Sequence, residues 1–252
     1  MNKIVKATVG IVAFYSVVSF FMIIVTELVF ANPSEVGRLG LSYGKWWAVL
    51  TSTFVHISYT HLGDDLKGVW SPAIAFVIVC ATGMHVYEFP SFKYSVAIFD
   101  LTPFFAALAG NGIYYTLLVP SNFISVGASG LVYAMFGTAL VVSVFYLRMA
   151  ARVLYTFPKR SEFARGRAQS IVLYSFVINA MASLAILGNI VNQLWDPTVF
   201  FVIQPLVGYQ IHILGFTVGI LGGAFFIFGA RVDRAHIRVR DLLIEHKAQM
   251  NQ

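Results

Sequence analysis

Long apolar stretches separated by short polar segments make up most of this chain. About 20 consecutive apolar residues cross a bilayer as an α-helix. We therefore predict an all-α, polytopic membrane protein with six transmembrane helices, over residues 9–31, 61–84, 95–119, 127–147, 170–193 and 206–229. The first stretch is longer than the apolar region of a cleaved signal peptide, usually about 7–15 residues, so we expect a retained helix.

Residues 32–60 follow a different pattern, which predicts an interfacial loop between the first two helices. Asn32-Pro33-Ser34 breaks the first helix. The apolar part, residues 46–58, is too short to span and is expected to lie in the interface or dip into it. Trp46 and Trp47 suit the headgroup level, where aromatic rings anchor.

Composition agrees with a chain that is largely embedded in lipid. Hydrophobic residues make up 58% of the 252 residues and charged residues 11%, whereas a soluble domain carries roughly 25% charged residues. The single cysteine, Cys80, excludes an intramolecular disulfide and a cysteine-based metal cluster. We expect Cys80 to be a small buried hydrophobic side chain.

The formal net charge of +6 predicts membrane topology and requires no nucleic-acid partner. Most Lys and Arg residues fall in the N-terminal segment, in the loop after the fourth predicted helix and in the tail, and such basic loops stay in the cytoplasm. We expect a multi-pass protein of the cell membrane with a cytoplasmic N-terminus (1–8), a membrane domain (9–229) and a basic cytoplasmic tail (230–252). The tail segment IRVRDLLIEH either forms a short amphipathic helix on anionic headgroups or is a solvated extension.

Ser129 and His212 are the candidate reactive residues. With six spans and both termini inside, the second, fourth and sixth helices run from the outside inwards. Ser129 lies about three residues into the fourth helix and His212 about seven into the sixth, which places both about 5–10 Å below the outer surface. Serine is a weak nucleophile until an adjacent base such as imidazole takes its proton.

Small residues indicate that these two helices touch, because small-residue faces let backbones approach closely in lipid. They are Gly130, Ala134 and Gly137 in the fourth helix and Gly215, Gly219 and Gly223 in the sixth. His212 shares the face of Gly215 and Gly219. Each signal alone has a plainer interpretation, because a serine between glycines is often a packing residue and an intramembrane histidine is often structural. The shared depth, direction and faces leave two readings open, a Ser–His dyad and a structural pair.

The segments GASGLVYAMFG (127–137) and HILGFTVG (212–219) resemble the rhomboid intramembrane serine proteases. That family has GxSG at the head of its fourth span, a tyrosine four residues after the serine, and HxxGxxxG in its sixth span. Here the tyrosine is Tyr133. The family pattern HxxxxHxxxN before the second span corresponds to His56, His61 and Asp65, with Asp65 in place of the asparagine. The approach W-R-x-x-T-x-x-F is matched at Trp47, Thr51 and Phe54 but not at Ala48.

The resemblance implies a rhomboid-like six-helix bundle and a role for each matched residue. Ser129 is then the nucleophile, and His212 the general base and later the acid. Tyr133 packs on the imidazole, the Ser129 backbone N–H and the His61 side chain hold the oxyanion, and His56 supports the outer loop. Oxyanion donors are typically worth about 3–4 kcal/mol each. The family needs no third acid, no metal and no organic cofactor.

Asp65 is the departure that matters, because an ionised carboxylate only accepts hydrogen bonds and repels an oxyanion. Three accounts stand. Asp65 is protonated, since desolvation disfavours its charged form; or it pairs with His61, which we favour; or activity is reduced. Asp64 and Lys67 form a candidate pair on the helix surface.

We therefore expect an intramembrane serine endopeptidase that cuts single-span or membrane-inserted proteins near the outer interface. Polar residues at the outer ends of the predicted spans are expected to line a water-filled cavity: His61, Asp64, Asp65, Asn122 and Ser125. Substrate is expected to enter where the fifth helix and the 194–205 loop border the site. The sequence leaves the oligomeric state open.

Two rival classes remain. A catalytically weak or inactive rhomboid-like protein that binds membrane segments for trafficking or quality control is favoured by Asp65 and Ala48. A small transporter that uses Asp64, Asp65, Asp100 and His212 lacks the internal repeat that such proteins carry. For Asp100 itself we expect a wetted carboxylate near the cytoplasmic interface, or a helix-start group, rather than a proton or ion site.

Overall fold

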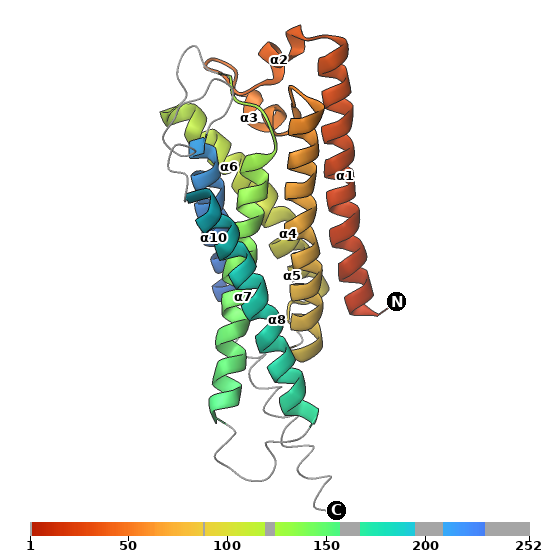
Figure 1. Cartoon of the computed structure of the whole chain (residues 1–252), viewed down its shortest axis with the longest axis vertical. Helices are drawn as coiled ribbons and strands as arrows, with labels where there is room; N and C mark the ends of the chain where they lie inside the picture. The colour runs from red at the N-terminus through yellow and green to blue at the C-terminus, as the bar shows by residue number, and fades with distance from the viewer. Residues whose placement is uncertain (1, 88, 119–123, 157–166, 195–208, 230–252) are drawn as a thin grey trace, which may run out of the picture.

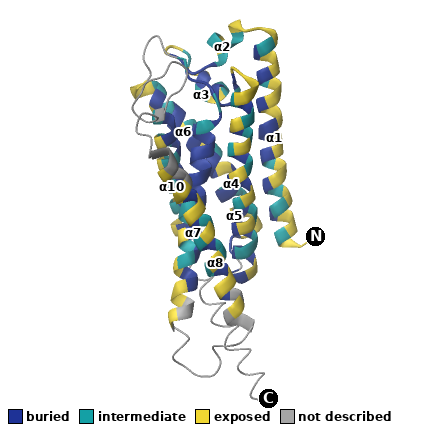
Figure 2. Cartoon of the chain, in the orientation of Figure 1, coloured by how far each residue is buried: buried dark blue, intermediate teal, exposed yellow. Residues whose placement is uncertain are grey.

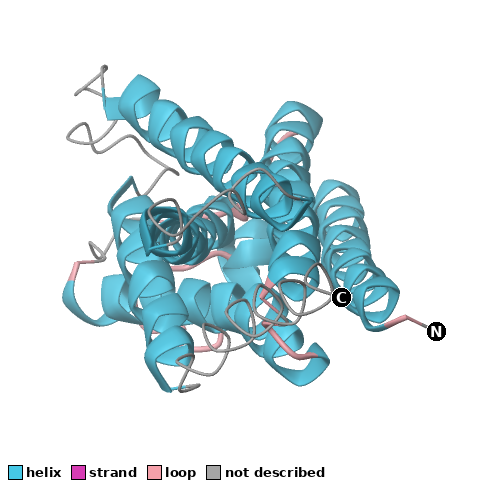
Figure 3. Ribbon diagram, turned by 90° about the horizontal axis from the view of Figure 1, so that it is seen from below, coloured by secondary structure: helices cyan, strands magenta, loops and turns pink. Residues whose placement is uncertain are grey.

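Helices make up nearly all of the computed structural model, which describes residues 2–87, 89–118, 124–156, 167–194 and 209–229 (Figure 1). The elements are α1 (Lys3–Ala31), α2 (Ser34–Leu39), α3 (Ala48–Thr51), the short 3-10 helix η1 (Ser52–Phe54), α4 (Tyr59–Val86), α5 (Phe92–Ser95), the π-helical turn η2 (Val96–Leu101), α6 (Thr102–Leu117), α7 (Ser129–Thr156), α8 (Arg167–Leu194) and α10 (Tyr209–Gly229). Within these ranges there is no strand (Figure 3), and a single isolated antiparallel bridge joins Leu41 to Ser125. The predicted all-α class therefore describes this part of the chain.

Among the described residues, five helical segments are long and apolar enough to cross a membrane: α1, α4, the continuous run Phe92–Leu117, α7 and α10. The predicted fifth span, residues 170–193, falls within α8, where the described apolar stretch, Val172–Gly188, is shorter than a typical span of about 20 residues. The protein is thus a multi-pass membrane protein with five supported spans, and the predicted count of six is not confirmed. The segment predicted as an interfacial loop contains α2, α3 and η1.

Local sequence explains where α4 and α6 begin. Ser58 caps α4, because its side chain accepts a hydrogen bond from the His61 backbone N–H at 3.1 Å. Pro103 stands in the first turn of α6, just after the π-helical turn η2, where the helical hydrogen-bond pattern changes. Pro72 lies inside α4, a position that transmembrane helices tolerate.

α7 lies at the centre of the bundle. In its apolar stretch 72% of the residues are buried, against 28% for α1, and Figure 2 shows the corresponding contrast between a largely buried α7 and an exposed outer face of α1. α4 and α7 both begin at the end of the molecule that carries α2 and α3 (Figure 1). Ser129 therefore stands at this end.

α7 and α10 run parallel and pack backbone against backbone. A Cβ atom on Gly215 would collide with the carbonyl oxygen of Gly130, and a Cβ atom on Gly219 would collide with that of Ala134. The Thr138 hydroxyl also donates across the interface to the Gly219 carbonyl oxygen at 3.1 Å. The faces of small residues identified in the sequence thus meet in the structure, and they bring the helices of Ser129 and His212 together.

Candidate active site

The segment that leads into α7 is held by hydrogen bonds from two distant parts of the chain. Leu41 and Ser125 exchange backbone hydrogen bonds at 2.8 and 2.9 Å. The Ala128 N–H donates to the Asp65 carboxylate at 2.6 Å. Because Ala128 immediately precedes Ser129, these contacts fix the direction in which the candidate nucleophile leaves the loop.

Gly127 is required at its position for two independent reasons. Its φ angle is +113°, which L-residues with a side chain rarely adopt. A Cβ atom there would also lie 2.7 Å from His61 Nε2 and 2.9 Å from Asp65 Oδ2. Its N–H donates to the Ser52 carbonyl oxygen at 3.0 Å. The missing side chain is therefore what allows His61 and Asp65 to approach the backbone two residues before Ser129.

His212 stacks on Tyr133, one turn after Ser129 on α7. The ring centroids are 4.4 Å apart and the ring planes differ by 11°. Both side chains are buried, and Ser129 is half-buried. The neighbours of the candidate pair also face each other, because a Cβ atom on Gly130 would lie 2.7 Å from the side chain of Ile211. Ser129 and His212 thus lie at the same level of two touching helices.

Three nitrogen atoms surround one oxygen of the Asp65 carboxylate. Oδ2 lies 2.6 Å from the Ala128 nitrogen, 3.1 Å from His56 Nε2 and 3.5 Å from His61 Nε2. The favoured pairing with His61 is present but is the longest of these contacts, and His56 is the closer histidine. The two imidazole rings stand edge to face, with centroids 5.1 Å apart.

Asp64, the neighbouring acid, behaves differently from Asp65. It pairs with Lys67 at 3.2 Å on an exposed surface, as the spacing predicts. Asp64 therefore does not belong to the buried group around Ala128.

Two further polar residues support the site and had no assigned role in the sequence. The hydroxyl oxygen of Thr26, in α1, lies 3.2 Å from His56 Nδ1. The Asn111 side chain, in α6, donates to the Val49 carbonyl oxygen at 3.0 Å and to the Thr53 hydroxyl at 3.3 Å. The sequence gives only a weak indication of these two roles, because a single polar residue in an apolar helix does not show which distant loop it contacts.

Asp100 does not lie where we expected it. It is 2% exposed, and its Oδ1 atom has no hydrogen-bond partner among the described residues. The interpretation as a wetted interfacial carboxylate is therefore wrong. Asp100 is buried because it lies in the π-helical turn η2, against which α1 packs. In this contact the Tyr15 hydroxyl of α1 donates to the Phe99 carbonyl oxygen at 2.5 Å. Cys80 is buried, as predicted.

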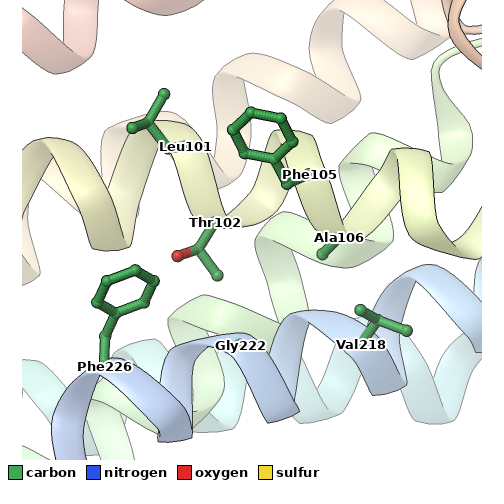
Figure 4. A pocket seen from close by; sticks show the side chains of 7 residues that line it. All are labelled: Leu101, Thr102, Phe105, Ala106, Val218, Gly222 and Phe226. Carbon is green, nitrogen blue, oxygen red and sulfur yellow. The ribbon is translucent and has the colours of Figure 1, made fainter. Parts of the chain in front are cut away.

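An apolar groove of about 330 Å³ lies between α10 and the segment of η2 and α6 (Figure 4). Its lining includes Leu101, Phe105 and Phe226 and carries no charged side chain. It offers no group for acid–base chemistry. Among the described residues, no set of three or more His, Cys, Asp and Glu side chains is placed to hold a metal ion. Asn122, most of the 194–205 loop and the tail lie outside the described residues.

Comparison with known proteins agrees in part with this picture. Over 130 residues the chain is 26% identical to a protein of Bacillus subtilis (strain 168) named "Putative rhomboid protease YdcA". The match covers 50% of this chain and 56% of that protein, so it spans little more than half of the relative's length. No protein-family model and no solved structure matches the chain. The similarity and the apolar helices together support a rhomboid-like membrane protein.

Proposed function

We propose that this protein is an intramembrane serine endopeptidase with Ser129 as nucleophile and His212 as general base. The observation that carries the proposal is the stacked Tyr133–His212 pair at 4.4 Å, on helices whose backbones are in contact. A stacked ring restricts the imidazole to one plane beside the start of α7. An oriented base next to a serine is the arrangement that nucleophilic catalysis needs.

The proposed reaction follows acyl transfer. The Ser129 hydroxyl attacks the substrate carbonyl while His212 takes its proton, and His212 then gives that proton to the leaving amine. Water then attacks the acyl-enzyme while His212 takes its proton, and the return of that proton to Ser129 releases the second product. The backbone N–H groups at the start of α7 and the positive end of its dipole favour negative charge at this point, and His61 is the side-chain donor closest to the segment before Ser129.

The proposed substrates are single-span or membrane-inserted proteins, cut near the outer interface. Ser129 is half-buried at the end of α7 next to α2 and α3, which is consistent with access to water from that end. The cleaved segment has to be extended, because a helix hides its carbonyl carbons from the nucleophile. Helix-breaking residues around the cleavage point should therefore favour hydrolysis.

A fluorophosphonate probe tests the proposal with the folded protein in detergent or liposomes. Wild type should be labelled, Ser129→Ala should not, and His212→Ala should lower the labelling rate by at least about 10³-fold, because the serine loses its base. Ser143→Ala is the matched control, since Ser143 is a buried serine on the same helix, and its labelling should equal that of wild type. Folded wild-type protein that takes no label contradicts the proposal.

One observation favours a second candidate, a non-catalytic protein that binds membrane segments. The Asp65 carboxylate lies 2.9 Å from the position of a Cβ on Gly127, two residues before the proposed nucleophile. A negative charge there opposes hydrolysis unless its neighbours neutralise it. This candidate gains support if the folded protein takes no label yet retains a fluorescent single-span peptide in liposomes.

A further inference from the structure

A chain of hydrogen bonds runs from the interior of α1 to the residue before Ser129. The Thr26 hydroxyl donates to the Met22 carbonyl oxygen at 2.7 Å, and the Thr26 oxygen lies 3.2 Å from His56 Nδ1. On the other side of the ring, His56 Nε2 lies 3.1 Å from Asp65 Oδ2. The same oxygen accepts from the Ala128 N–H at 2.6 Å. One imidazole and one carboxylate thus connect α1, the segment before α4, α4 itself and the segment before α7.

Every side chain of this hydrogen-bonded chain is buried. Thr26 and His56 are 0% exposed and Asp65 is 8% exposed. In such surroundings hydrogen bonds are stronger than in water, and a polar atom that loses its partner costs the full desolvation penalty. Removal of one of these side chains therefore leaves the others less firmly held in place.

Counting donors fixes the hydrogen at one end of the chain. Thr26 has one hydroxyl hydrogen, which its bond to Met22 uses, so its oxygen accepts from His56 Nδ1–H. At the other end, the contact of 3.1 Å between His56 Nε2 and Asp65 Oδ2 needs one shared proton, because two lone pairs would otherwise face each other.

We propose that Asp65 is a positioning residue that, together with His56 and Thr26, fixes the N-terminus of α7 and so the placement of Ser129. This inference rests on the proposed function, since it concerns the same serine. It assigns the carboxylate a role that does not require contact with the oxyanion. The carboxylate also stands at a helix N-terminus, where negative charge is favourable.

Thr26 provides the sharpest test, because it lies on α1 and contacts His56 through its hydroxyl. Thr26→Val removes the hydroxyl and keeps the shape of the side chain. We expect the second-order rate of fluorophosphonate labelling to fall about tenfold, because misplacement by a fraction of an ångström lowers reactivity steeply. Thr26→Ser restores the hydroxyl and should recover most of the rate.

Thr82→Val is the matched control. The Thr82 hydroxyl makes the same local bond, to the Ile78 carbonyl oxygen at 2.7 Å, but on α4 and outside the chain of hydrogen bonds. It should leave the labelling rate unchanged. A Thr26→Val rate equal to that of the control, with wild type labelled normally, overturns the positioning role and leaves the proposed function intact. Wild type without label overturns the proposed function itself.

Asp65 itself is tested by two substitutions with opposite expectations. Asp65→Asn keeps an oxygen for the Ala128 N–H and should keep or raise proteolysis of a single-span substrate. Asp65→Leu offers no acceptor and should lower kcat about 100-fold with KM nearly unchanged, because the serine is displaced while substrate contacts remain. Asp64→Asn controls for loss of a nearby charge. A large loss of kcat in Asp65→Asn, or full kcat in Asp65→Leu, contradicts the inference.

If Thr26→Val lowers the thermal unfolding midpoint in detergent, its labelling rate is measured well below that midpoint and compared with Thr26→Ser. A deficit that persists at low temperature and is recovered by serine supports positioning. A deficit that disappears at low temperature shows a purely structural role and overturns the inference.

Discussion

At the scale of single residues, Gly127 shows how the site depends on an absent side chain. Its φ of +113° and its closeness to His61 Nε2 are separate constraints, and glycine alone meets both. Gly44 also has a positive φ, +83°, but no atom lies within 4 Å of its Cβ position. The two glycines therefore separate the effect of backbone strain from the effect of a steric contact.

Gly127→Ala should abolish most activity, whereas Gly44→Ala should not. Both substitutions introduce strain of about 1–3 kcal/mol, which thermal unfolding in detergent measures. Only alanine at 127 must also displace His61 and Asp65, so we expect its fluorophosphonate labelling rate to fall about 100-fold. Equal labelling rates in the two variants would show that the close approach at Gly127 has no catalytic consequence.

At the scale of elements, the contact between α7 and α10 decides whether a dyad can exist. Gly219 lies two turns beyond His212 and touches no predicted catalytic group, yet its Cα faces the Ala134 backbone directly. A helix pair this close cannot accept a methyl group without separating. The interface therefore couples a packing residue to the geometry at Ser129.

Gly219→Ala should reduce both stability and labelling. Overpacking typically costs about 1–3 kcal/mol, and here the colliding atoms belong to backbone that cannot rotate away. Gly229→Ala, the same substitution at the end of the same helix, meets no atom within 4 Å and serves as the control. Unfolding midpoints and labelling rates that do not differ between the two variants would refute the close packing.

α8 contains the predicted fifth span, which the described residues do not confirm. Its polar residues face the bundle: the Ser175 hydroxyl donates to the Tyr87 hydroxyl at 3.1 Å, and the Asn179 side chain donates to the Ser175 carbonyl oxygen at 2.8 Å. These residues are buried among neighbouring helices. Both lie within the apolar stretch Val172–Gly188, so this helix places polar side chains inside the bundle without exposing them.

At the scale of the whole molecule, the distribution of basic residues predicts the orientation in the membrane. α1 has 29 residues, a length of about 43 Å, which exceeds the roughly 30 Å of a bilayer core. Its two ends should therefore face opposite sides. Cys80 is 1% exposed and should not react with a polar thiol reagent. Labelling of an introduced cysteine can therefore be measured without a contribution from the native one.

Lys3→Cys and Ser34→Cys test that orientation. Both positions are exposed, at opposite ends of α1. In intact cells a membrane-impermeant maleimide should label Ser34→Cys, whereas Lys3→Cys should react only after permeabilisation, because basic segments stay in the cytoplasm. Labelling of both variants from the same side would exclude a spanning α1.

The sequence by itself predicted the five long apolar helices that the structure supports, a shared depth for Ser129 and His212, and the small residues on the faces that meet. These are local properties, because hydrophobic length and helical periodicity are fixed by neighbouring residues. Only the tertiary structure decided that Asp65 lies closer to His56 than to His61, that Thr26 extends this contact into α1, and that Asp100 is buried. Those outcomes depend on how helices distant in sequence rotate and pack against one another, and no local pattern records that rotation.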